Sequence, residues 1–297
     1  MSKKVKENKR KKRWGDRSDG RRLRSLDPFY FFTPYIMKTR VGSANQIKIT
    51  VDVANMEKYI NKKRGEGLKG FGALHLILAA YVRTVSQLPA LNRFISGQRI
   101  YARYDIQCMM AVKKDMTIDG EETVIKAHYM PDDTVETVFE KFNTIINETK
   151  QAKENNVEST ANILMHLPRF LIRFTVRLLE FLDYFGILPK FLLEVSPFHG
   201  SFFITSMGSL GIPAIYHHLY NFGNCPAFCC YGPKYYKNEI DKNGETVRRK
   251  YMDMTFVLDE RTCDGLYYAQ ALKRMLKYIN NPDLLDTEEI TVIEDVD

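Results

Sequence analysis

No long hydrophobic run in this sequence is free of charge. The most apolar region, residues 163–195, contains seven charged side chains, whereas a membrane-spanning helix needs roughly 20 mostly uncharged residues. The N-terminus is charged and has no apolar segment behind it, which argues against a secretory signal. We therefore expect a soluble cytoplasmic protein.

Cysteine is scarce, and the sequence has no internal repeat and no long linker rich in Gly, Ser or Pro. Five cysteines, an odd number spread through 297 residues, argue against a disulfide framework. With 44% hydrophobic and 12% aromatic residues, the chain can bury a sizeable core. We expect a basic disordered arm over residues 1–30 and a single domain over residues 31–297 that ends in an acidic tail.

Positive charge is concentrated at the N-terminal end. Residues 1–24 carry twelve Lys or Arg against three acids, and the other residues carry 32 bases against 33 acids, so the formal charge of +8 belongs to this segment. Such a block is expected to be a solvated arm. Three functional alternatives stay open: the arm binds an anionic membrane surface, a nucleic acid or an acidic partner protein. Trp14 would serve as an interfacial anchor.

Periodicity predicts a mixture of strands and helices. Apolar and polar residues alternate over residues 46–53, which indicates a half-buried strand. Asp133 and Glu136 resemble a capping box that opens a helix. Further strands are expected over residues 99–112, 202–206, 227–231 and 251–258, and helices over 55–66, 70–88, 133–150, 161–195 (broken at Pro168, Gly186 and Pro189) and 266–279. The elements do not alternate strictly, so we expect an α+β fold.

Two stretches join an apolar strand to a polar turn: GSFFITSMGSLG (200–211) and FVLDERTCDG (256–265). Each alone is typical of an ordinary strand end. In this order and spacing they resemble the catalytic domain of the 2-oxoacid dehydrogenase acyltransferases and the related chloramphenicol acetyltransferases, which show a GTFTISNLG-like strand and an HxxxDG signature within a DHRxxDG-like stretch. The matching residues are Gly200, Phe202, Ile204, Thr205 and Gly208, and then Asp259, Arg261, Asp264 and Gly265. The resemblance covers most of the body and implies a two-layer sandwich of a mixed β-sheet with packed helices.

Glu260 stands where this family has its catalytic histidine. In the family, that imidazole takes a proton from the thiol of coenzyme A or of dihydrolipoamide, or activates the acyl acceptor. An imidazole pKa of about 6.5 lies about 2 units below a thiol pKa of about 8.5, whereas a carboxylate pKa lies about 4 units below it. Glu260 is therefore the weaker base by about 3 kcal/mol before its surroundings act on it.

The resemblance implies a catalytic set of Glu260, Asp264 and Thr205. Thr205 would donate a hydrogen bond to the tetrahedral oxyanion, and Asp264 would hold the loop in place. A coenzyme A thioester would be the co-substrate, with no covalently bound cofactor. The family builds its active site between neighbouring subunits, which implies a homotrimer. No lipoyl or subunit-binding domain is recognisable in this chain.

Histidines and cysteines in residues 217–230 include the residue types of a zinc site. However, neighbours in a strand point in opposite directions, so we expect no metal. A base recruited from elsewhere in the chain stays open as an alternative to Glu260. The candidates are His199, His217 and His218.

Three arginines, Arg169, Arg173 and Arg177, follow one another at four-residue spacing. They predict a basic stripe beside a broad apolar helix face. This helix is expected to pack on the domain or on a neighbouring subunit. The alternatives are a membrane-surface helix acting with the basic arm, or a cover over the substrate channel.

The leading functional hypothesis is acyl transfer from coenzyme A to an unknown acceptor, with weakened or altered activity. One alternative is a non-catalytic acyltransferase-like protein that serves binding or scaffolding. The other is a peripheral membrane or nucleic-acid binder that acts through residues 1–24.

Overall fold

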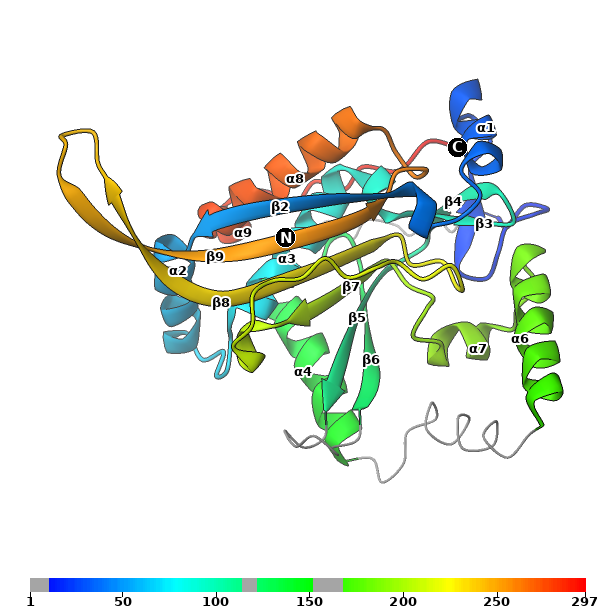
Figure 1. The fold of residues 1–297 in the computed structure, drawn as a ribbon, viewed down its shortest axis with the longest axis horizontal. Coiled ribbons are helices and arrows are strands. Elements are labelled where there is room, and N and C mark those ends of the chain that lie inside the picture. Colours follow the sequence, from blue (N-terminus) through cyan, green and yellow to red (C-terminus); the bar gives the residue numbers. More distant parts are fainter. Residues whose placement is uncertain (1–10, 114–121, 152–167) are drawn as a thin grey trace, which may run out of the picture.

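The described part of the chain, residues 11–113, 122–151 and 168–297 of a computed structural model, forms two sheets (Figure 1). The larger sheet has the strand order β2-β9-β8-β7-β5-β6, and the smaller one has the order β1-β4-β3. The strands are β1 (Gly20–Arg22), β2 (Ala44–Asp52), β3 (Arg93–Ser96), β4 (Arg99–Arg103), β5 (Ile106–Lys113), β6 (Glu122–Tyr129), β7 (Phe202–Ser206), β8 (Ala227–Ile240) and β9 (Thr246–Asp259). The helices are α1 (Pro28–Ile36), α2 (Ala54–Gly65), α3 (Ala73–Gln87), α4 (Val135–Gln151), α6 (Arg169–Tyr184), α7 (Lys190–Val195), α8 (Gly265–Asn280) and α9 (Leu284–Thr287).

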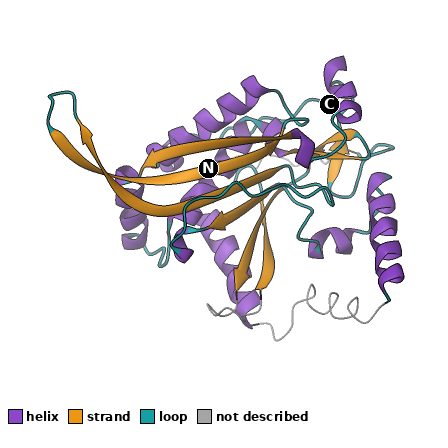
Figure 2. Ribbon diagram, in the orientation of Figure 1, coloured by secondary structure: helices purple, strands orange, loops and turns teal. Residues whose placement is uncertain are grey.

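One face of the large sheet is covered by helices α2, α3, α4 and α8 (Figure 2). Strand β7 runs parallel to β5 and β8, and the other pairs in this sheet are antiparallel. The core lies between the two layers, where Tyr81 of α3 stacks on Phe202 of β7 with ring centroids 4.0 Å apart. This arrangement confirms the predicted two-layer α+β sandwich of a mixed sheet with packed helices.

The opposite face of the sheet is partly covered by the irregular segment 211–224. The Ile215 amide donates to Cys230 Sγ at 3.3 Å, and the hydroxyl of Thr255 donates to the Ile215 carbonyl. His217 stacks on Phe228 of β8 with centroids 4.0 Å apart. This irregular segment therefore takes the place of a helix layer on this face, where Phe228, Cys230 and Thr255 are buried.

Residues 11–30 differ from the disordered arm expected from their charge. Strand β1 pairs with β4, and Arg17 is only 1% exposed. Its guanidinium binds Asp19 at 2.8 Å and Asp183 at 2.7 Å. Further along, Arg13 pairs with Asp297 at 3.0 Å. Asp183 and Asp297 are distant in sequence, so a local count of charge could not reveal them as partners of Arg17 and Arg13. The rest of the expected arm, residues 1–10, lies outside the described residues.

Most element predictions hold, with two differences, and the structure adds elements that the sequence analysis does not predict: β1, β3, β6, α1 and α9. Strands β8 and β9 extend well beyond residues 227–231 and 251–258 and form the long hairpin at the left of Figure 1. Helix α4 is capped by Thr134, whose hydroxyl accepts the Thr137 amide, rather than by Asp133. The helix expected over residues 161–195 with breaks at Pro168, Gly186 and Pro189 is confirmed within the described residues: α6 begins after Pro168 and ends before Gly186, and α7 begins after Pro189. Residues 161–167 lie outside the described residues.

Candidate functional site

A buried carboxylate, that of Asp259, fixes the turn that follows β9. Asp259 is fully buried and accepts two hydrogen bonds from Arg261, 2.8 Å from Nε and 2.7 Å from Nη2. The carboxylate of Asp259 also accepts a hydrogen bond from Ser43 Oγ at 3.1 Å and forms an ion pair with Arg40, whose Nε lies 3.5 Å away. The backbone carbonyl of Asp259 accepts from the hydroxyls of Thr262 and Tyr268. These contacts fix the position of the residues that follow.

Glu260 occupies the exposed position of this fixed turn. Its amide donates to the Ser43 carbonyl at 2.9 Å, and its side chain is exposed, whereas those of its neighbours Asp259 and Arg261 are buried. Glu260 therefore presents a carboxylate outward from a rigid backbone. It can accept a proton from a molecule bound against this turn.

Asp264 closes the same turn and begins helix α8. Its carboxylate accepts the Tyr267 amide at 2.7 Å and the Tyr30 hydroxyl at 2.9 Å. The bond from the Tyr267 amide, and then that from Tyr30, lower the pKa of Asp264. These contacts join α8 to α1, so Asp264 acts on the turn as a positioning residue.

Thr205 lies on β7 and is half-buried. It alternates with Ile204, which faces the helix-covered core, so Thr205 shares the opposite sheet face with Phe203. A threonine hydroxyl at this face can donate a hydrogen bond to a bound molecule.

The structure does not bring Thr205 and Glu260 together within one chain. Thr205 is in register with Cys230, and Cys230 with Thr255 of β9. Glu260 follows Thr255 by five residues, which corresponds to about 16 Å along the strand. A site that uses both side chains therefore requires two copies of the chain.

The three histidines considered as replacement bases differ in their surroundings. His199 is 1% exposed, with Nδ1 2.7 Å from Ser196 Oγ and Nε2 3.4 Å from Asp183. Burial lowers its pKa and also separates it from solvent. His217 and His218 stack on each other on the sheet face that carries Thr205, and burial lowers the pKa of His217. Of the three, only this pair is open to a bound molecule.

A cavity of about 380 Å³ lies beside the Glu260 turn. It is bounded by the C-terminal half of α6, the β3–β4 turn, and residues 38–40 and 221–223. Its charged lining includes Lys38, Arg40, Glu180, Asp183 and Arg261. Because Arg261 follows Glu260 directly, a molecule in this cavity would lie close to the turn.

Among the described residues, no three His, Cys, Asp or Glu side chains are grouped as a metal site would require. All five cysteines are free and buried. Cys229 faces the helix-covered core, whereas Cys230 contacts Ile215 on the other sheet face. Within the same residues, no helix combines the length and hydropathy that a membrane crossing needs.

A charged cluster around His128 was missed by the sequence analysis. His128 Nδ1 lies 2.6 Å from Asp105, and Nε2 lies 3.0 Å from Glu194, so the ring connects β6 to the start of β5 and to α7. The contact with Asp105 raises the pKa of His128. Its three members are far apart in sequence, and no local pattern could have found them.

This cluster predicts a pH-dependent contribution to stability. Because the folded pKa is raised, the contribution is complete below the ordinary histidine pKa of about 6.5 and is lost as the pH rises through the folded value. We expect His128→Gln to lower the free energy of unfolding at acidic pH and less so above neutrality. The side chain is 39% exposed, so the difference should stay below about 1 kcal/mol. Urea unfolding of both proteins across this range measures it, and a difference that grows with pH would contradict it.

The fold matches solved acyltransferase structures at low sequence identity. A probable dihydrolipoamide acetyltransferase from Listeria monocytogenes is 11% identical with a TM-score of 0.56, and the match covers 91% of this chain and 97% of that one. The dihydrolipoamide acetyltransferase of Azotobacter vinelandii is 13% identical with a TM-score of 0.57, over 86% and 88% of the two chains. A chloramphenicol acetyltransferase is 11% identical with a TM-score of 0.53, over 86% and 99%.

These likenesses define the class by fold: the chain has the acyltransferase-like fold of dihydrolipoamide and chloramphenicol acetyltransferases. No family model matches the chain, and neither does any curated protein. The resemblance inferred from the two motifs is thus confirmed for the fold. The roles of Glu260, Asp264 and Thr205 stay predictions.

Proposed function

We propose that this protein transfers an acyl group from a coenzyme A thioester to an acceptor not yet identified. The observation that carries the proposal is the placement of Glu260, exposed on a turn fixed by Asp259, within an acyltransferase-like fold. Thr205 supports it, because its hydroxyl group is only half-buried and lies on the sheet face away from the helices.

The reaction needs one base and one oxyanion donor. Glu260 takes the proton of the acceptor nucleophile while the nucleophile attacks the thioester carbonyl. Thr205 donates a hydrogen bond to the resulting oxyanion. When the tetrahedral species collapses, the carbon–sulfur bond breaks, and the proton on Glu260 passes to the coenzyme A thiolate. No other reactant is required.

The two groups act across a boundary between copies in this proposal. About 16 Å of strand separates the register position of Thr205 from Glu260 in one chain. We therefore expect Thr205 of one copy to face Glu260 of its neighbour in a homotrimer. The cavity beside Arg261 is where we expect the thioester to approach the turn.

A non-catalytic binding protein is the second candidate, and the exposure of Glu260 favours it. The side chain of Glu260 faces solvent, and no described side chain is placed to orient it toward a thiol or to receive a proton from it. In that case the fold would bind an acyl group or coenzyme A without turnover.

Substitution of Thr205 tests the proposal. We expect Thr205→Ala to reduce thiol release from acetyl-coenzyme A about a hundredfold in kcat, because an oxyanion donor is lost. Thr205→Ser keeps the hydroxyl and should retain most activity. The assay follows the free thiol with a panel of amine, hydroxyl and dihydrolipoamide acceptors.

Two controls sharpen this assay. Ser206→Ala removes the next hydroxyl along β7 and should leave the rate unchanged. His217→Ala tests the imidazole on the same sheet face. Wild-type turnover unaffected by Thr205→Ala would reject the assigned role, and loss of turnover in His217→Ala but not in Glu260→Gln would move the base to His217.

A further inference from the structure

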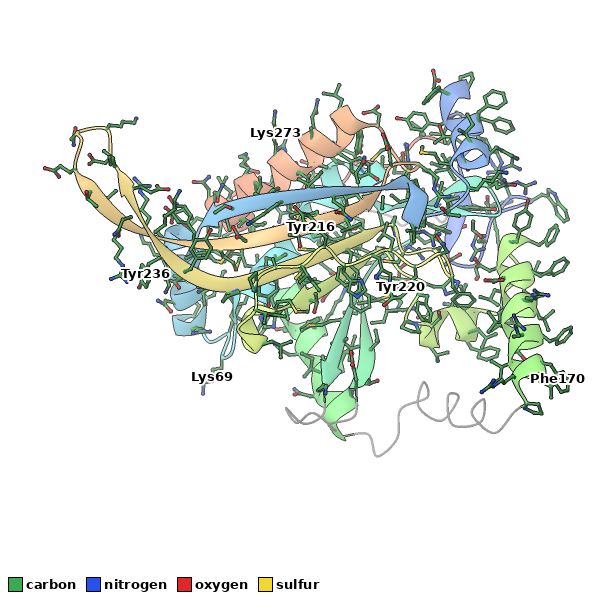
Figure 3. The ribbon with its side chains drawn as sticks, viewed as in Figure 1. Lys69, Phe170, Tyr216, Tyr220, Tyr236 and Lys273 are labelled. Carbon is green, nitrogen blue, oxygen red and sulfur yellow. The ribbon has the colours of Figure 1, made fainter. Side chains whose placement is uncertain are left out.

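The outward side of helix α6 is apolar and exposed. None of its sixteen residues is buried. Phe170, Phe174, Phe181 and the following Phe185 are 57–68% exposed, and their spacing places them on one stripe. Figure 3 shows Phe170 pointing away from the body of the molecule. The sequence predicts that this helix packs on the domain or on a neighbouring subunit. Only the side opposite the phenylalanines packs on the domain, and the residues there are half-buried.

Polar contacts hold the C-terminal end of α6 in place. Asp183 binds Arg17 at 2.7 Å, and the Tyr184 hydroxyl donates to Gln98 at 3.0 Å. The adjoining Gly97 is packed so closely that a Cβ there would lie 2.0 Å from the Tyr184 carbonyl oxygen. The helix is thus fastened to the β3–β4 turn with its phenylalanines facing outward. The helix therefore offers its exposed phenylalanines on a surface that is fixed relative to the small sheet.

A basic stripe borders the phenylalanines. Arg169, Arg173 and Arg177 follow one another by one helical turn each, and all three are exposed. Among the described residues, no carboxylate pairs with any of them. Of the two acids in α6, Asp183 is bound to Arg17, and within the described residues no ion pair joins Glu180 to the stripe.

Helix α1 carries further exposed apolar side chains at the same end of the molecule. Both α1 and α6 lie at the right of Figure 1, and both contact the small sheet, α1 at β4 and α6 at the β3–β4 turn. The exposed apolar residues of α1 include Phe29 (74%) and Ile36 (77%). Trp14, in the segment before β1, is 97% exposed.

We propose that the α6 face, defined by Phe170, Phe174, Arg173 and Arg177, binds an anionic lipid membrane at headgroup depth. A row of phenylalanines beside a row of arginines is the pattern of a helix that lies in the membrane plane, with rings among the acyl chains and guanidinium groups at the phosphates. Lipid phosphates provide the negative charge that the arginines do not find among the described residues. This binding is independent of the proposed acyl transfer.

The proposal differs from membrane binding through the basic arm. Within residues 13–24, Arg17 is buried, Arg24 binds Asp16, and Arg21 donates to the backbone of residues 295 and 296. Much of that charge is already satisfied by protein groups. On the α6 face, by contrast, Arg169, Arg173 and Arg177 lie beside apolar side chains and have no carboxylate partner among the described residues.

Vesicle flotation of the full chain tests the proposal. We expect binding to vesicles of phosphatidylcholine mixed with phosphatidylserine, weak binding to phosphatidylcholine alone, and release by salt. The double variant Phe170→Ser with Phe174→Ser should weaken binding about tenfold or more, because two exposed rings lose their insertion. The double variant Arg173→Glu with Arg177→Glu should weaken binding to anionic vesicles at least as much.

Matched controls come from the β8–β9 hairpin at the opposite end of the molecule. Tyr236→Ser with Ile240→Ser removes exposed apolar side chains, and Lys242→Glu with Arg248→Glu makes the same change in net charge. Both should bind like the wild type. Circular dichroism confirms that all variants fold.

Four results would overturn the proposal. The wild type would fail to float with anionic vesicles, or the hairpin variants would lose binding as much as the α6 variants. A deletion of residues 1–12 that abolishes binding while the α6 variants retain it would assign the membrane contact to the arm. Loss of self-association in the phenylalanine variant, without vesicle binding by the wild type, would assign the face to a second copy of the chain.

Discussion

Replacing Asp259 with alanine is expected to lower the free energy of unfolding by about 3–5 kcal/mol, the usual effect of removing one partner from a buried ion pair. Asp259 is 0% exposed, and its two arginine partners, Arg261 and Arg40, are 3% and 5% exposed. Without the carboxylate, two guanidinium groups remain in the interior with only backbone carbonyls as acceptors. Urea unfolding followed by circular dichroism measures the change.

Asp253→Ala provides the matched control on the same strand. Asp253 also pairs with a cation, Lys48 at 2.8 Å, but the lysine side chain is 53% exposed. Water can replace that partner, so the loss should stay below about 1 kcal/mol. Equal losses in the two variants would show that burial of the Asp259 pair does not set the stability of the turn.

The second large effect concerns the base. With dihydrolipoamide as the acceptor, Glu260→His is expected to raise thiol release from acetyl-coenzyme A about a hundredfold. An imidazole is a better base than a carboxylate toward the acceptor thiol, by about 3 kcal/mol. The substitution falls on an exposed side chain, so the fold should be unaffected. The rate of Glu260→His should also rise with pH, because a histidine loses its proton and becomes a base at its ordinary pKa of about 6.5.

Glu260→Gln separates the two functional candidates. It keeps the shape of the side chain and removes its basicity, so an enzymatic wild type should lose most of its turnover. Turnover that is present only in Glu260→His, and absent from both the wild type and Glu260→Gln, would identify a non-catalytic binding protein. A wild type faster than Glu260→His would show that the carboxylate is the suited base for an acceptor other than a thiol.

The sequence predicts this fold where local pattern and tertiary packing agree. The alternation of Ile47, Ile49 and Val51 with polar residues indicates a half-buried strand, and in the structure these three residues face the helices. The motif around Thr205 is likewise a strand, and that around Glu260 is a strand end and turn. In these segments the side-chain period alone determines which face is buried.

The remaining features depend on contacts between distant residues. The sequence predicts that Arg17 belongs to a solvated arm. Only the folded structure brings Asp183 to it and buries the Arg17–Asp19 pair. His128 joins Asp105 and Glu194 only after β5, β6 and α7 have assembled. The separation of Thr205 from Glu260 follows from sheet register, which the motifs themselves do not encode.

The Arg17–Asp183 ion pair also bears on how the protein can be shortened or tagged. It ties the N-terminal segment to the helix that carries the lipid-facing phenylalanines, and Arg17 further donates to Ser96 at 2.8 Å. Cutting the chain after residue 24 would therefore unfasten α6 as well as remove charge. Only a cut ahead of Arg13 leaves both this link and the Arg13 contact with Asp297 intact, and a fusion to the C-terminal Asp297 would disturb the latter from the other side.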